Sequence, residues 1–286
     1  MLLYKNIVMI TDPDIQFVIK KPLCDGIGNV IKSYITAYSV NNNSKIDCNP
    51  EYSLGLYDTV LEDFHIYHET PNIIPNYMYT SRLLVLPEEE EEQSHIFSAE
   101  NHEVNGCGNN EFNYLYSFRR LIDYNYDPGR ICERVKQRII KTIEKIHFLS
   151  FIENKVLEKN IPINNSILAI SIRTWKCFHE RDIHREYNPE TYKETIKKVI
   201  LSENPESVLV SFDNHDYENE YMDFLRDFGI PVTVLRKEPD TNELQHAFIK
   251  MLSLSKCRYY IGNRISTFSE LVWWFSQCKI KVYPLF

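Results

Sequence analysis

A short turn near the end of the chain gathers several groups that can bind an anion. Residues 259–261 are apolar, and residues 262–269 supply a glycine, an asparagine, an arginine and three hydroxyl side chains before an amphipathic segment. The first amides of a helix have no partner within it, and the helix dipole adds partial positive charge there. Such a turn is typical of a phosphate-binding site. The candidate binding residues are Asn263, Arg264, Ser266, Thr267 and Phe268.

Two further polar loops follow apolar runs in the same half of the chain. Arg173 comes directly after residues 166–172, and its guanidinium could contact a diphosphate through two parallel hydrogen bonds. Asp213 comes directly after residues 208–212, and its carboxylate could accept hydrogen bonds from a ribose or a base. Each residue has an ordinary alternative. Arg173 could pair with a nearby carboxylate, and Asp213, like Ser266 or Thr267, could cap a helix.

The elements that must position these loops alternate between strand and helix. Apolar runs predict strands over residues 166–172, 208–212, 231–235, 259–261 and 279–283. Apolar residues at helical spacing predict helices from Pro189 to 200, over 217–228 with Gly229 as the stop, over 244–254, and through 271–275. This alternation is typical of an α/β fold, with a parallel sheet covered on both faces. Ligands of such sheets bind beyond the carboxyl ends of the strands.

The first half of the chain is less regular. Strands are predicted at residues 7–10, 16–19 and 82–86, and a helix at 29–38. Gly26, Gly28 and Asn29 precede that helix and could let the backbone approach a ligand closely, although an ordinary tight turn has the same composition. A helical stripe over residues 135–146 is interpreted as a bridge between two domains, residues 1–160 and 161–286.

Composition excludes several classes of protein. The chain has 286 residues, of which 43% are hydrophobic, so two domains can each bury a core. A net charge of −8 argues against a nucleic-acid partner. No apolar run approaches the ~20 residues of a membrane span. The seven scattered cysteines include no C-x-x-C pair, so we expect reduced thiols, no structural metal site and a cytoplasmic location.

Four of these motifs together resemble the fucosyltransferase superfamily, which includes bacterial nodulation α-1,6-, animal core and α-1,2-, and protein O-fucosyltransferases. The similar segments are residues 26–29, 171–176, 211–214 and 265–269. In this resemblance, Arg173 corresponds to the first arginine of the superfamily's His-x-Arg-Arg-x-Asp motif. Ser171, Thr174 and Lys176 stand where that motif has its histidine, second arginine and aspartate.

The resemblance implies a GT-B arrangement of two facing Rossmann-like domains, with the donor on the C-terminal domain and a glycan acceptor on the N-terminal one. It implies an inverting transfer without a bound metal, with GDP-fucose as the favoured donor. The departures in the motif also allow another deoxy sugar or a pentose on GDP or UDP. Arg173, Ser266 and Thr267 would stabilise the leaving diphosphate. Glu180 or Asp182, which follow the arginine, would supply the base, with His179 and His184 nearby.

Two other functions are compatible with the same sequence. A metal-dependent transferase of UDP-sugars could bind Mn²⁺ through Asp12 and Asp14, or through Asp213 and Asp216. A protein that binds a nucleotide sugar or a glycan without turnover would account for the arginine and aspartate missing from the motif.

Overall fold

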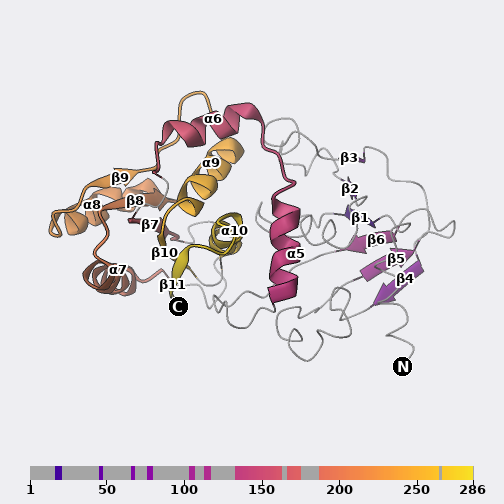
Figure 1. Cartoon of the computed structure of the whole chain (residues 1–286), viewed down its shortest axis with the longest axis horizontal. Helices are drawn as coiled ribbons and strands as arrows, with labels where there is room; N and C mark the ends of the chain where they lie inside the picture. The colour runs from indigo at the N-terminus through magenta and orange to yellow at the C-terminus, as the bar shows by residue number, and fades with distance from the viewer. Residues whose placement is uncertain are drawn as a thin grey trace. The chain divides into compact units, whose positions relative to one another are not determined.

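The computed structural model divides the chain into two compact units, Met1–Leu149 and Ser150–Phe286 (Figure 1). The structure describes six short strands between residues 17 and 116, and then residues 133–162, 166–174, 187–263 and 266–285. The predicted strands at 7–10 and 82–86 and the predicted helix at 29–38 lie outside these residues. Because the two units are separate bodies, each is described by itself.

The first unit contains a mixed six-stranded sheet in the order β3-β2-β1-β6-β5-β4. β1, β2, β3 and β6 pair in parallel, whereas β4 and β5 are antiparallel to their neighbours. The strands are β1 Phe17–Lys20, β2 Lys45–Asp47, β3 Ile66–Tyr67, β4 Asn76–Tyr79, β5 Glu103–Gly106 and β6 Asn113–Tyr116. β1 confirms the strand predicted at 16–19. Helix α5, Glu133–Ile143, confirms the helical stripe and buries Ile139, Ile140 and Ile143.

The second unit contains a five-stranded sheet in the order β11-β10-β7-β8-β9, and every pairing is parallel. Its strands are β7 Ile167–Ile172, β8 Ser207–Phe212, β9 Val232–Val234, β10 Tyr259–Asn263 and β11 Lys281–Leu285. Its helices are α6 Ser150–Glu158, α7 Pro189–Glu203, the 3-10 helix η4 His215–Tyr217, α8 Glu218–Arg226, α9 Glu243–Ser255 and α10 Thr267–Phe275. The α/β class and the parallel sheet predicted for this half are confirmed.

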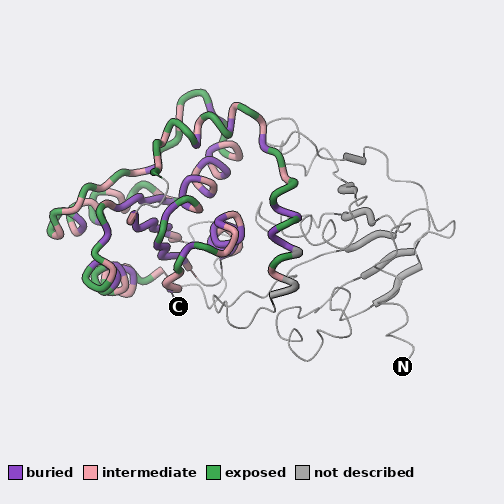
Figure 2. The backbone as a smooth tube through the Cα atoms, in the orientation of Figure 1, coloured by how far each residue is buried: buried purple, intermediate pink, exposed green. Residues whose placement is uncertain are grey.

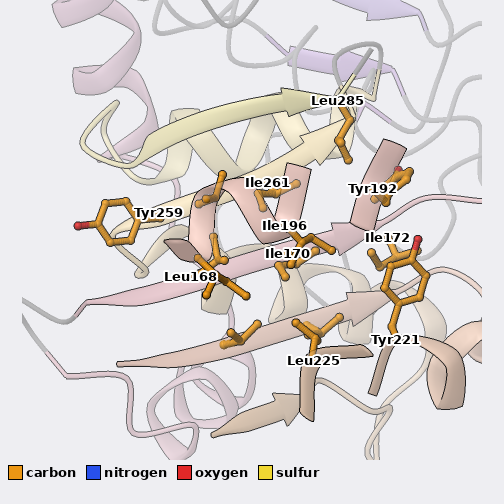
Figure 3. Close-up of a cluster of buried hydrophobic side chains, with 14 of the residues drawn as sticks. Leu168, Ile170, Ile172, Tyr192, Ile196, Tyr221, Leu225, Tyr259, Ile261 and Leu285 are labelled. Atoms are coloured by element: carbon orange, nitrogen blue, oxygen red, sulfur yellow. The ribbon is translucent and has the colours of Figure 1, made fainter. Parts of the chain in front are cut away.

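The core of this unit lies on both faces of the sheet. Side chains of a strand alternate between faces, and Leu168, Ile170 and Ile172 of β7 all pack on the face covered by α7 and α8 (Figure 3). Tyr192 of α7 and Tyr221 of α8 belong to the same buried cluster. The remaining β7 residues are buried on the opposite face, where α6 packs with α9 and α9 with α10. Buried and exposed positions alternate along the helices, as expected for amphipathic elements (Figure 2).

Local sequence explains where these helices begin and end. The Asn188 side chain accepts hydrogen bonds from the second and third amides of α7, and Pro189 occupies the first helical position. A capping box formed by Asn242 and Gln245 begins α9. Gly229 follows α8 with φ of 66°, a left-handed conformation that glycine adopts without strain. The helix itself ends at Arg226 with Asp227 as its C-cap, so Gly229 lies in the turn that follows rather than at the predicted stop.

Strand register brings the predicted loops to one edge of the sheet. Ile172 is paired with Phe212, so the chain leaves β7 and β8 at the same level. Ile170 is paired with Ile261, which places Asn263 at the level of Ile172. Since all three strands are parallel, Arg173, Asp213 and Asn263 lie at the carboxyl edge. In the described part of the chain, no helix is long and apolar enough to cross a membrane.

Candidate functional site

Arg173 and Asp213 form an ion pair between the ends of β7 and β8. Arg173 Nη1 lies 3.3 Å from Asp213 Oδ2, and the two side chains are 28% and 17% exposed. The backbone N–H of Thr174 donates to both Asp213 oxygens at 3.0 Å, and the Thr174 hydroxyl donates to Oδ1 at 3.0 Å. Asp213 therefore holds the start of the loop that follows β7, and the guanidinium with it.

The structure tests the ordinary alternatives for these two residues, an ion pair for Arg173 and a helix cap for Asp213, and supports only the first. Arg173 does pair with a carboxylate, and the partner is the other predicted binding residue at this edge. Asp213 does not cap the following helix, because the Asn214 side chain does so by accepting from the Asp216 amide. The two predicted residues are thus brought together in one charged pair. Because each cancels the other's charge, the pair alone presents no net charge to a ligand.

Tyr192 joins this pair to the third predicted loop. Its buried hydroxyl accepts a hydrogen bond from Arg173 N and donates to Arg173 O, both at 3.2 Å, and it also bonds to the Asn263 side chain. Burial raises the pKa of Tyr192 to about 12, so the hydroxyl keeps its proton at neutral pH. By sequence, Tyr192 is one of the apolar residues at helical spacing in the helix predicted from Pro189 to 200, which indicates only a place in the core. Its phenol at the first turn of that helix was the available signal.

The turn after β10 begins α10 without a side-chain cap. Ser266 is the N-cap residue, and its amide donates to Asn263 O at 3.1 Å. The Ser266 side chain is buried but makes no capping hydrogen bond, unlike the capping asparagines of α7 and α9. Thr267 and Phe268 occupy the first turn of the helix. Ser266 therefore occupies the N-cap position that the capping alternative gave it, but its side chain makes no capping hydrogen bond, and Thr267 is the first residue of the helix.

A buried hydroxyl network anchors this turn to the sheet. Tyr260 of β10 donates to Ser269 Oγ at 2.9 Å and is hydrogen-bonded to Ser171 of β7. The phenol lies directly over Gly262, where an added Cβ would come within 2.6 Å of its ring and hydroxyl. Gly262 is thus required for the close approach of the phenol. Ser171 is thus joined to Tyr260 across β7 and β10.

The other predicted residues lie outside the described part of the chain. These are Gly26, Gly28 and Asn29 of the first unit, Glu180 and Asp182 between β7 and α7, and Arg264 between β10 and α10. Their roles stay predictions. No group of three or more potential metal ligands occurs among the described residues. Both oxygens of Asp213, a ligand in the metal-dependent alternative, accept from Thr174, and Oδ2 also pairs with Arg173.

Replacing Tyr192 by phenylalanine tests whether the hydroxyl holds the strand ends together. The variant leaves the Arg173 amide and the Asn263 side chain without this partner. We therefore expect the free energy of unfolding to fall by about 1–3 kcal/mol. Urea denaturation measures this change, with Tyr217→Phe as the matched control, since the recorded contact of Tyr217 with Tyr187 is between rings. Equal stability of the two variants would show that the Tyr192 hydroxyl does not support the site.

Comparison with known proteins gives a likeness of structure alone. No protein-family model and no curated protein matches the sequence. POFUT1 in complex with GDP-fucose is 11% identical, with 96% of this chain and 99% of that chain aligned and a TM-score of 0.52. The fucosyltransferase NodZ from Bradyrhizobium is 15% identical, with 90% and 92% aligned and a TM-score of 0.53. A variant of Arabidopsis thaliana FUT1 in complex with GDP is 12% identical, with 100% and 74% aligned and a TM-score of 0.55.

These neighbours define the class of fold. They are fucosyltransferases of the GT-B type, and alignment over nine-tenths or more of this chain takes in both of its units. The chain therefore has the α/β fold of the GT-B fucosyltransferases, which confirms the fold that the sequence motifs implied.

Proposed function

We propose that the protein is a glycosyltransferase that moves a sugar from a nucleotide diphosphate onto a hydroxyl of a glycan. The favoured donor is GDP-fucose, and the proposed transfer inverts the anomeric carbon without a bound metal. One observation carries the proposal. The Arg173 backbone and the Asn263 side chain are bridged by the Tyr192 hydroxyl, so the guanidinium and the uncapped start of α10 lie at one edge of the sheet.

This arrangement suits the leaving group of such a reaction. As the bond between the anomeric carbon and the diphosphate breaks, negative charge grows on the phosphate oxygens. A guanidinium and the amides of a helix start, held in place beforehand, stabilise that charge without reorganising. The acceptor hydroxyl must lose its proton to a base within hydrogen-bond reach. Glu180 and Asp182 are proposed for this role because they follow Thr174 in the loop that leaves the same edge.

The choice of donor is supported by the contents of the similar structures. POFUT1 was solved with GDP-fucose and a variant of Arabidopsis FUT1 with GDP. The fold shared with those proteins supports a nucleotide diphosphate at the carboxyl edge of this sheet, where such folds bind their ligands. The substitutions at Ser171, Thr174 and Lys176 are the reason for testing other sugars and UDP as well.

A thermal-shift panel of GDP, UDP and their common sugar conjugates tests the donor. A ligand at 100 times its dissociation constant stabilises the native protein by about 2.7 kcal/mol. For a protein of this size that corresponds to a rise in Tm of several degrees. We expect GDP and GDP-fucose to give this rise and UDP to give none. A rise in Tm with UDP alone would overturn the choice of guanine as the nucleobase of the donor. No rise with any nucleotide would overturn the proposed function.

A transfer assay with the stabilising donor and a mixture of glycan acceptors separates the remaining functions. Turnover that persists after thorough chelation with EDTA is expected, and loss of turnover would favour the metal-dependent alternative. Donor binding without transfer to any acceptor would favour the non-catalytic binder.

A further inference from the structure

Lys250 is a mostly buried cation beside the candidate site. It lies on α9, whose neighbouring positions Phe248, Ile249 and Met251 are buried in the core. Its ammonium donates to the carbonyl oxygen of Phe212 at 3.1 Å. Phe212 is the last residue of β8, directly before Asp213. The Lys250 side chain therefore extends from the helix to the carboxyl edge of the sheet, where Arg173 and Asp213 lie.

Among the residues that the structure describes, the ammonium has a single hydrogen-bond acceptor. It has three protons to donate, and the Phe212 carbonyl is the hydrogen-bond acceptor recorded for it among the described residues. Burial lowers the pKa of Lys250, whereas the carboxylates of Asp213 and Glu243 act in the opposite direction and the charge of Arg173 adds to the lowering. Both oxygens of Asp213 already accept hydrogen bonds from Thr174. A partly buried charge with few partners is costly, so its presence at this edge needs an explanation.

The balance of charge at the site provides that explanation. Arg173 and Asp213 together carry no net charge, because the guanidinium and the carboxylate cancel. Adding the protonated Lys250 makes the group of three net positive by one charge, and Glu243, which also acts on Lys250, is paired with Lys237. A diphosphate approaching this edge is attracted by the positive charge of Lys250, whereas the Arg173–Asp213 pair alone would be neutral. The helix start at α10 adds only partial charge.

We propose that Lys250 is a further binding residue for the diphosphate, supplying the net positive charge that the Arg173–Asp213 pair lacks. This assignment rests on the proposed function, since it takes the bound anion to be the diphosphate of a nucleotide. It gives a role to a side chain that the sequence motifs do not include. The competing explanation is mechanical: Lys250 would only fasten α9 to the end of β8 through the Phe212 carbonyl.

Calorimetric titration with inorganic pyrophosphate and with GDP distinguishes the two explanations. Lys250→Met keeps the length and volume of the side chain but removes its charge, and Lys250→Arg keeps the charge. Lys198→Met, at an exposed position of α7, is the matched control. We expect Lys250→Met to weaken pyrophosphate binding by roughly 10- to 100-fold, the effect of losing one hydrogen bond to a charged group. Lys250→Arg should retain more of the affinity, and Lys198→Met should retain all of it.

Each outcome bears on the assignment separately from the proposed function. If Lys250→Met binds pyrophosphate as tightly as the wild type and only its Tm falls, the mechanical explanation holds and the assignment is overturned. A wild-type protein that does not bind pyrophosphate overturns it equally. Binding of pyrophosphate that depends on Lys250, without binding of any nucleotide, would support the assignment and refute the proposed function. Should Lys250→Met fail to fold, Lys250→Gln carries the same comparison.

Discussion

Replacing Arg173 by alanine is expected to lower kcat/KM for sugar transfer by roughly 10²-fold or more, since a preorganised charge acting on the transition state contributes roughly 3–4 kcal/mol. The guanidinium lies at the carboxyl edge of the sheet, 3.3 Å from Asp213, and its backbone is held by the Tyr192 hydroxyl. The variant therefore loses its charge at the point where the leaving group would sit. Steady-state kinetics with the donor found in the thermal-shift panel measures the change.

The Arg173→Ala variant needs a control for its effect on Asp213. Removing the guanidinium leaves that carboxylate with fewer partners, and an unpaired anion would itself repel a diphosphate. Asp213→Asn removes the negative charge, so the double variant separates the two contributions. Arg226→Ala is the control for a surface arginine, because Arg226 is 73% exposed and pairs only locally with Asp223. Transfer by Arg173→Ala at near the wild-type rate would remove this residue from the proposed mechanism.

Gly262→Ala is expected to destabilise the second unit and to weaken donor binding at the same time. The new Cβ would lie 2.6 Å from the Tyr260 ring and hydroxyl, a distance at which one of them must move. Tyr260 is fully buried and bonded to Ser269, so it cannot swing into solvent. Overpacking of this kind lowers the free energy of unfolding by about 1–3 kcal/mol. Breaking the bond to Ser269 also releases the first turn of α10, so the affinity for the donor should fall with the stability.

Two further variants test whether the effect of Gly262→Ala comes from its contact with Tyr260. Gly229→Ala introduces the same methyl group where no atom lies within 4 Å, at a left-handed position outside the site. It should reduce stability by about 1 kcal/mol through backbone strain and leave donor affinity unchanged. Tyr260→Leu removes the hydroxyl and the far part of the ring. In the Tyr260→Leu background, Gly262→Ala should lower the free energy of unfolding much less. An equally large loss of stability there would show that the clash with Tyr260 does not cause the destabilisation.

The pattern of side chains predicted the fold of the second unit closely. Apolar runs located all five parallel strands. In β7 and β8, which are buried almost along their whole length, the run reflects burial on both faces of the sheet. Pro189 located the start of α7 and Gly229 the turn after α8, since their backbone preferences act locally. The edge strand β9, predicted over residues 231–235, is shorter in the structure, Val232–Val234. An edge strand has a neighbour on one side only, so its length depends on pairing that apolar content does not report.

The candidate site was predicted in part. Arg173, Asp213, Asn263 and Ser266 were identified because polar residues directly after buried strands must lie at the carboxyl edge. Whether Arg173 would meet a carboxylate stayed open, because that depends on the register of β7 against β8. Tyr192 and Lys250 were missed as site residues, since each lies on a helix and reaches the edge only through helix packing. Tyr192 had been assigned to the core, and Lys250 carried no signal in the sequence at all.

The sequence by itself determined the alternation of strands and helices, the parallel sheet and the edge at which polar groups gather. These follow from local backbone preferences and from the periodicity of apolar residues, which act over a few positions. Only the tertiary structure decided which groups meet at that edge: Arg173 with Asp213, Tyr192 with Asn263, and Tyr260 with Ser269. The physical reason is that these contacts join different strands and helices, so strand register and helix packing set them.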